Sequence, residues 1–98
     1  MNVYLIDTNL TEDMNRELNS NLSEDMMKNL RDIDLKISID LLNEEDKISS
    51  VLVCDKINLE KMKVFFNSYN ITYNVNDITE LFDNLEDISE DDILEKIC

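Results

Sequence analysis

Hydrophobic and polar residues alternate strictly in two short stretches of the chain. Residues 35–41 read Leu-Lys-Ile-Ser-Ile-Asp-Leu, and residues 71–76 repeat the same alternation. Because successive side chains of a strand point to opposite faces, this pattern predicts strands with one buried face and one exposed face. Residues 2–7 and 48–55 are apolar almost throughout, which predicts strands buried on both faces. The polar residues 43–47 between two of these strands predict a hairpin loop.

A helical period replaces this alternation in two other stretches. Residues 12–33 carry an apolar side chain every three or four positions, as a helix with one buried face does. Polar residues near the middle indicate a break into two helices, with Thr11 capping the first and Ser23 the second. Residues 59–69 repeat the period. Asn58 is the predicted cap of that helix, and Asn70 is the residue that ends it in the left-handed conformation.

These elements follow one another as β-α-β-β-α-β, the order of the ferredoxin-like α+β folds. That fold predicts an antiparallel sheet with helices on one face, in which the first and third strands are central. The two continuously apolar strands are the first and the third, so hydrophobicity and chain order agree. We therefore expect a ferredoxin-like core over residues 1–76, with residues 77–98 as an acidic helical C-terminal appendage of the same single domain.

The C-terminal segment has an apolar pattern of its own. Thr79 is a candidate cap for a short helix, and Ser89 with Asp92 forms an approximate capping box for another. The side chains expected to dock on the core are Ile78, Phe82, Leu85 and Ile88. We therefore expect helices here and not a structureless tail.

Phe65 and Phe66 are neighbours in the sequence, so both cannot point inward on one helical stripe. One of them is a candidate surface anchor for a partner, a role that aromatic side chains fill at interfaces. The alternative is a core position that the C-terminal segment covers. Tyr73 is expected to face the core together with Ile71 and Val75.

The amino-acid composition excludes most catalytic mechanisms, because the residue types that they need are missing. The chain contains no His, Gly, Pro or Trp. Without His there is no Ser-His-Asp or Cys-His arrangement, and without Gly there is no P-loop or Gly-rich dinucleotide turn. The carboxylates of residues 87–95 offer oxygen ligands for Ca²⁺ or Mg²⁺, yet they lack the alternation and the glycine of an EF-hand. We therefore expect a protein that is not an enzyme and has no cofactor or metal site.

The chain is also rich in Asn and Ile, with 13 and 11 residues. The codons of the missing residue types are mostly GC-rich, so this bias indicates a low-GC bacterial genome, or a phage or plasmid within one. With no glycine, tight turns must be formed by Asn and Asp. Two cysteines do not make a disulfide framework. Cys54 is expected in the core, and Cys98 at a frayed end.

The net charge of −14 is concentrated towards the C-terminal end. No Lys or Arg occurs between Val64 and Glu95, while nine acidic residues accumulate there. Direct binding to nucleic acid or to an anionic membrane is disfavoured, because both need Lys and Arg to neutralise phosphates. No apolar run is long enough to span a membrane, and no basic residue precedes the first apolar stretch. We therefore expect a cytoplasmic protein.

The acidic C-terminal face is the candidate partner-binding site. Its members are Asp83, Glu86, Asp87, Glu90, Asp91, Asp92 and Glu95. A surface charged in this way can serve solubility alone. Alternatively, the carboxylates can bind a basic protein. In the most specific version of this second alternative, they imitate the phosphates of DNA. In size, acidity and lack of a catalytic motif the chain resembles phage-borne inhibitors of restriction and CRISPR nucleases as a class. The resemblance implies an inhibitor or regulator of a nuclease or defence complex.

A second interpretation belongs to another class of function. Ferredoxin-like domains have free edge strands, and the predicted strand at residues 35–41 could pair with a copy of itself or with another protein. Lys36 and Asp40 on its polar face partly guard that edge. The chain would then be a structural or assembly module, such as a homodimer.

Overall fold

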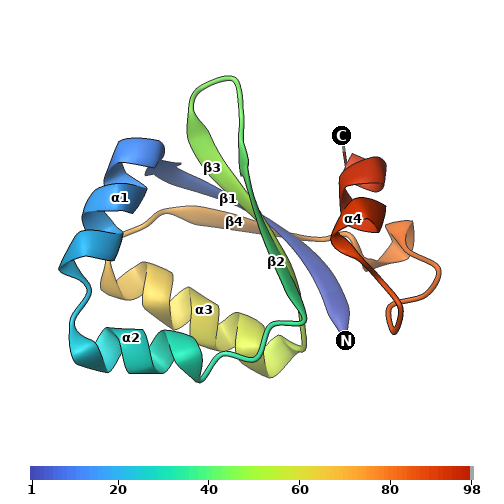
Figure 1. Cartoon of the computed structure of the whole chain (residues 1–98), viewed down its shortest axis with the longest axis horizontal. Coiled ribbons are helices and arrows are strands. Elements are labelled where there is room, and N and C mark those ends of the chain that lie inside the picture. Colours follow the sequence, from blue (N-terminus) through green and yellow to red (C-terminus); the bar gives the residue numbers. More distant parts are fainter. Residues whose placement is uncertain (98) are drawn as a thin grey trace.

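A four-stranded antiparallel sheet organises the molecule. The computed structural model describes residues 1–97 and places the strands in the order β2-β3-β1-β4 (Figure 1). The strands are β1 (Asn2–Thr11), β2 (Ile37–Leu42), β3 (Lys47–Cys54) and β4 (Tyr73–Asp77). The predicted α+β class is confirmed, and the first and third strands are the central ones.

Burial along the strands follows their place in the sheet. Every residue of β3 from Ile48 to Cys54 is buried, because β3 has a strand on each side and a layer on each face. The edge strands β2 and β4 alternate between more and less exposed positions, as their sequences predict. Hydrophobic patterning therefore distinguishes the central strands from the edge strands.

Three helices cover one face of the sheet. They are α1 (Glu12–Asn21), α2 (Glu24–Arg31) and α3 (Lys56–Ser68). The predicted break between α1 and α2 is confirmed, since the hydroxyls of Thr11 and Ser23 accept the N–H groups of Met14 and Met26. The core beneath these helices consists of Tyr4, Ile6, Leu10, Ile48, Leu52, Cys54, Leu59, Phe65, Phe66 and Ile71.

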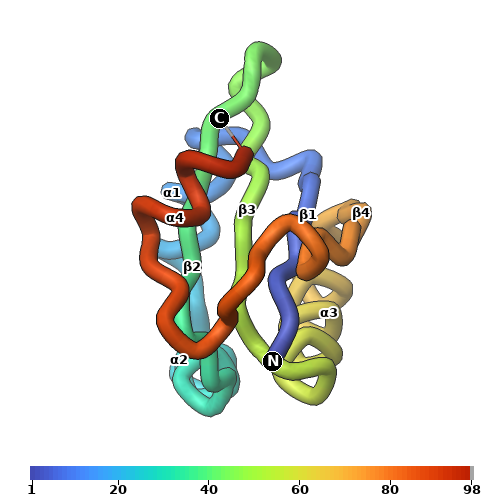
Figure 2. The backbone as a smooth tube through the Cα atoms, turned by 90° about the vertical axis from the view of Figure 1, so that its right-hand side faces the viewer, coloured from blue at the N-terminus to red at the C-terminus, as the bar shows by residue number. Residues whose placement is uncertain are grey.

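The C-terminal segment covers the opposite face of the sheet (Figure 2). It contains the 3₁₀ turn η1 (Thr79–Leu81) and helix α4 (Glu90–Ile97). A second core forms there around Val3, Ile39, Val51, Val53, Ile88 and Ile93. All four side chains expected to dock belong to this second core, Ile88 as a buried member and Ile78, Phe82 and Leu85 packed against it. No helix of the described part of the chain is long and apolar enough to cross a membrane.

The cap of α3 is Asp55 and not the predicted Asn58. Oδ1 of Asp55 accepts the N–H of Asn58 at 2.8 Å, because β3 ends at Cys54 and the next residue is the first one free to cap. Asn58 is buried one turn into the helix. Its side chain accepts the N–H of Asp34 at 2.9 Å and donates to Asp55 at 2.9 Å. It therefore ties α3 to the loop that leads into β2.

Both alternatives predicted for the second of Phe65 and Phe66, a surface anchor and a core position under the C-terminal segment, were wrong. Phe65 and Phe66 are both buried, and their ring centroids lie 6.1 Å apart in an edge-to-face arrangement. Both belong to the core on the helical face, while the C-terminal segment lies on the opposite face. Helix α3 packs against the sheet and against α2, so two adjacent sides of the helix are covered.

Thr79 begins η1 without capping it, which differs from the prediction. Its hydroxyl instead accepts the N–H of Val3 at 3.0 Å, and the backbone N–H of Ile78 donates to the carbonyl of Val3 at 2.9 Å. The start of the C-terminal segment is therefore joined to the beginning of β1. The capping box predicted at Ser89 and Asp92 is present in α4 and contributes to the site described next.

Candidate functional site

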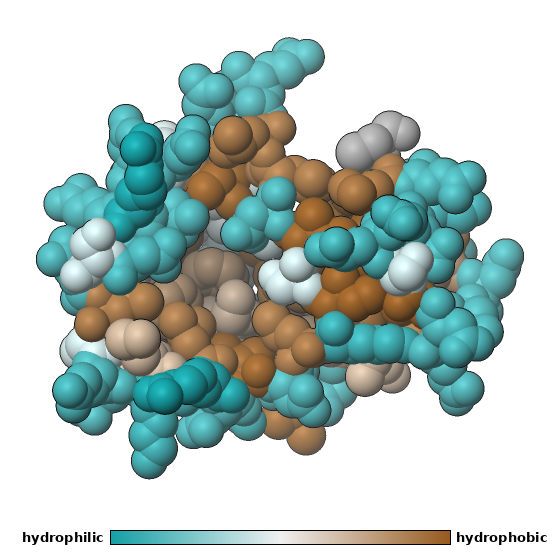
Figure 3. Space-filling view, viewed as in Figure 1, coloured by the Kyte–Doolittle hydropathy of each residue, from teal (hydrophilic) through white to brown (hydrophobic). Residues whose placement is uncertain are grey.

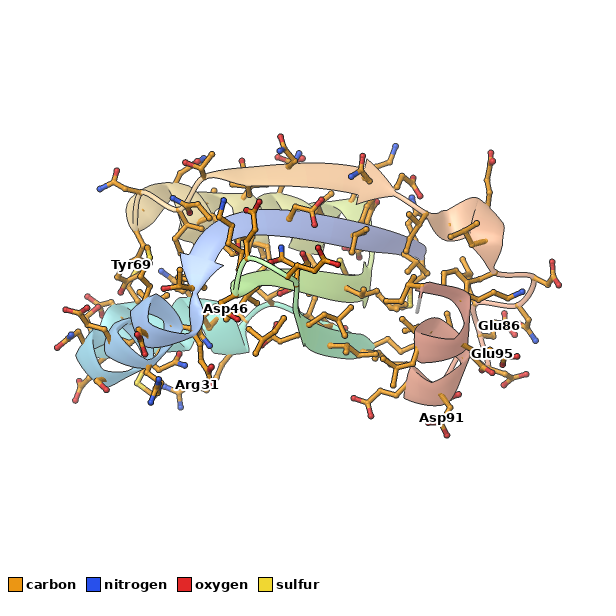
Figure 4. The ribbon with its side chains drawn as sticks, turned by 90° about the horizontal axis from the view of Figure 1, so that it is seen from above. Arg31, Asp46, Tyr69, Glu86, Asp91 and Glu95 are labelled. Carbon is orange, nitrogen blue, oxygen red and sulfur yellow. The ribbon has the colours of Figure 1, made fainter. Side chains whose placement is uncertain are left out.

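The acidic C-terminal face lies at one end of the molecule. Figure 4 shows Glu86, Asp91 and Glu95 together there, with Arg31 at the opposite end. All seven predicted site residues are exposed. The segment that carries them also contributes apolar side chains to the second core, among them Phe82, Leu85, Ile88 and Ile93. Because these side chains are anchored on the sheet, the carboxylates between them are held on the outer surface.

A reciprocal capping box fixes the start of α4. The N–H of Ser89 donates to Oδ2 of Asp92 at 3.0 Å, and the N–H of Asp92 donates to the hydroxyl of Ser89 at 3.2 Å. Glu90 and Asp91 occupy the same first turn, where the partial positive charge of the helix terminus stabilises acids. Three neighbouring carboxylates are therefore compatible with a stable helix.

Four of the predicted residues surround one shallow hollow of about 290 Å³. Asp83, Asp87, Asp92 and Glu95 line it, together with Asn84, Lys96 and the apolar Phe82 and Ile88. The side chain of Asn84 donates to Oδ2 of Asp87 at 3.2 Å. The other three members, Glu86, Glu90 and Asp91, lie outside this hollow. The structure therefore divides the predicted site into a concave group and an outer group.

Lys36 is a contributor to this region that the sequence does not reveal. Its Nζ donates to the carbonyl oxygen of Leu85 at 2.8 Å and also to that of Glu86. Lys36 and Glu86 are 50 positions apart in the sequence, so no local sequence pattern could have predicted this contact. Lys36 binds backbone carbonyls here, and it therefore anchors the segment without pairing with a carboxylate.

The acidic face has little internal compensation of charge. In the part of the chain that the structure describes, the ion pairs are Asp13–Arg16, Glu45–Lys47 and Glu60–Lys63, and none includes a residue of the acidic face. Within residues 1–97 no three acidic or thiol side chains converge on one metal position. The face therefore presents carboxylates to solvent, free to meet an external cation or a basic surface.

Cys54 is a free thiol in the core and is fully buried. Burial, with the charge of Asp55 as a smaller cause, raises the pKa of Cys54 to about 11. A thiol with so high a pKa is protonated near neutral pH and is a poor nucleophile. The expectation for Cys98 lies outside the described residues.

Comparisons with protein-family models, with curated proteins and with solved structures found no match to this chain. Its function is therefore inferred from its own surfaces. The acidic face, the sheet edges and the cavities between the layers are the features that such an inference can use.

Proposed function

We propose that the chain is a non-enzymatic inhibitor or regulator that binds a basic surface on a nucleic-acid-handling protein, such as a nuclease or a defence complex. The observation that carries this proposal is the anchored display of seven exposed carboxylates with no ion-pair partner among the described residues. Solubility needs net charge but does not need the charges held in place. A fixed array suits recognition, because a partner can match its geometry.

Binding would begin with long-range attraction and end with local contacts. The uncompensated acids raise the rate of encounter with a positively charged groove, and the groove then contacts individual carboxylates. In the DNA-mimic form of the proposal, these carboxylates occupy the positions of phosphates and exclude nucleic acid from the groove. The chain itself needs no direct contact with nucleic acid or membrane, and no cofactor.

The test compares two charge-matched variants with the natural chain. The first neutralises the face: Glu86→Gln, Glu90→Gln, Asp91→Asn and Glu95→Gln, none of which has a recorded side-chain hydrogen bond within residues 1–97. The control neutralises the same number of exposed acids elsewhere: Glu17→Gln, Glu24→Gln, Asp25→Asn and Glu44→Gln. Each variant is used to retain proteins from a low-GC bacterial lysate at low and at high salt.

The natural chain and the control are expected to retain one basic nucleic-acid-binding protein at low salt, while the face variant loses it. High salt releases it, because exposed charges are screened beyond about 8–10 Å at physiological ionic strength. The retained protein is then purified, and the chain should displace a labelled DNA duplex from it. Equal retention by both variants, or retention that salt does not affect, would contradict the proposal.

A second candidate function is self-association through a sheet edge, which would make the chain a structural or assembly module. Within residues 1–97 strand β2 pairs only with β3, so its outer edge has no strand partner there, and its last residue, Leu42, is 56% exposed. Light scattering tests this candidate. A stable dimer at both low and high salt would favour it over the acidic face.

We also propose that residues 1–76 form a ferredoxin-like core carrying an acidic C-terminal appendage. The strand order β2-β3-β1-β4 with antiparallel neighbours supports this assignment, and the pair α1 and α2 in place of one helix is the departure from it. A cytoplasmic location in a bacterium, or in the host of a phage or mobile element, fits the proposed partner.

A further inference from the structure

Two matched carboxylate–hydroxyl pairs lie on opposite faces of the sheet. On the helical face, the hydroxyl of Ser50 donates to Oδ1 of Asp40 at 2.6 Å. On the other face, the hydroxyl of Ser49 donates to Oδ1 of Asp7 at 2.7 Å. The two serines are adjacent in β3, so they point to opposite sides. The pairs differ in their surroundings: Asp7 lines a polar hollow that also includes Lys47, whereas Asp40 and Ser50 line a cavity with an apolar wall.

That cavity, of about 160 Å³, lies between the sheet and the three helices of its face. Its apolar wall comes from β1, β3, the three helices and the loop after α3: Leu10, Leu18, Leu30, Ile48, Leu52, Met62, Phe65, Phe66 and Ile71. Figure 3 shows the molecule hollowed between the helices and β2, with hydrophobic surface inside and hydrophilic surface around the mouth. A cavity of this size and character can hold a compact apolar group such as a benzene ring.

The polar residues of the cavity are few and are drawn from β1, β2, β3 and α1: Thr8, Asn15, Asn19, Ser38, Asp40 and Ser50. Asp40 is the only charged side chain among all the lining residues, and it is exposed to solvent. Ser50 occupies one of its oxygens, which fixes the carboxylate and leaves its second oxygen without a recorded partner within residues 1–97. No Lys or Arg in this described range forms an ion pair with Asp40.

We propose that this cavity binds a small primary amine with an apolar body, such as an arylalkylamine. The apolar wall takes the ring, and the ammonium group donates to the free oxygen of Asp40, because a charge-assisted hydrogen bond is stronger than a neutral one. The amides of Asn15 and Asn19 and the hydroxyl of Ser38 line the same cavity and supply further oxygens that can accept hydrogens of the ammonium group. The acidic protein, with its net charge of −14, attracts a cation and repels an anion of the same shape.

The test uses 2-phenylethylamine as the probe, with ethylbenzene and 3-phenylpropionate as neutral and anionic analogues. Titrations followed by calorimetry and by two-dimensional NMR are run on the natural chain, Asp40→Asn and Asp7→Asn. Both substitutions remove one charge and keep an oxygen that can accept from the neighbouring serine. The Asp7 variant is therefore the matched control on the opposite face.

The amine is expected to bind the natural chain and the Asp7 variant equally, and to shift the methyl resonances of Leu18, Leu30 and Leu52. Asp40→Asn should weaken it about twofold to fivefold, the loss expected for one exposed ion pair, because solvent screens the charge of Asp40. The analogues should bind more weakly than the amine. Absence of binding, equal weakening by both variants, or equal affinity for ethylbenzene would overturn the proposal. These results are independent of whether the acidic face binds a basic protein.

Discussion

Asparagine and aspartate perform the turn-forming work that glycine performs in most chains. Asn70 and Asp46 have positive φ values of 56° and 57°, and Asn70 ends α3 where the sequence predicted a left-handed residue. Oδ1 of Asn43 accepts the N–H groups of Glu45 and Lys47, both at 3.0 Å, and so closes the predicted hairpin loop. Composition alone indicated these roles.

The pH dependence of stability is a prediction at the scale of one residue. The Cys54 thiol has an ordinary pKa of 9.0 and a folded-state pKa of about 11. Between these pH values the unfolded chain loses the proton first, so the free energy of unfolding should fall as pH rises. Denaturant titrations from pH 8 to pH 11 measure this fall. Tyr4, whose pKa burial also raises, adds to it above pH 10.

Cys54→Ala is the comparison for this prediction. The substitution should lower the free energy of unfolding at every pH by about 1 kcal/mol, because packing is lost. The free energy of unfolding of the variant should also fall less between pH 9 and pH 11 than that of the natural chain. A decline as steep as that of the natural chain would show that Cys54 is not its source.

At the scale of the elements, their type and order were predictable and their ends were not. Strand β1 was predicted to end at residue 7 and continues to Thr11. The extension depends on Asn9, whose N–H donates to the carbonyl of Thr72 and whose side chain accepts the N–H of Thr72. Because Thr72 is 63 positions from Asn9, the sequence around Asn9 does not predict this extension of the strand. Asn58 is a similar case, because its part-buried hydrogen bond from the N–H of Asp34, 24 positions away, decides its role over its preference for helix caps.

The attachment of the C-terminal segment is testable through one side chain. Ile93 of α4 is fully buried in the second core, so Ile93→Ala should cost about 2–4 kcal/mol of unfolding free energy through lost burial and a cavity. Leu81→Ala, at a position 49% exposed, should change it by about 0.5 kcal/mol or less. Urea titrations measure both. Similar values for the two variants would mean that the segment adds nothing to the fold.

The acidic face occupies one end of a molecule whose longest dimension is 38 Å. Glu86, Asp91 and Glu95 lie at that end, while most of the basic residues, Arg31 among them, lie elsewhere and are mixed with acids (Figure 4). The sequence identified the acidic residues and their exposure, because a run of acids interrupted by apolar residues has few other arrangements. It could not divide them into the group around the hollow and the outer group, since that depends on how the segment crosses the sheet.

Self-repulsion should make the stability of the molecule depend on salt. Raising NaCl from about 0.01 M to about 0.5 M shortens the screening length from about 30 Å to a few Å, so the melting temperature should rise by several degrees. About 1 kcal/mol shifts the melting temperature of such a domain by about 4–8 °C. The variant with four neutralised face residues should melt higher at low salt and respond less. A melting temperature that falls with salt would contradict this account.

The elements that cover strand β1 all follow it in the sequence, so the ribosome synthesises them after β1. Its neighbours are β3 and β4, its two faces are covered by the helices and by the C-terminal segment, and Thr79 binds the backbone of Val3 across 76 positions. A ribosome must therefore have passed Ile93 before this apolar strand has its full surroundings. Until that point the nascent chain carries an apolar strand with unpaired backbone groups, which makes it prone to aggregation unless it folds quickly or a chaperone binds it.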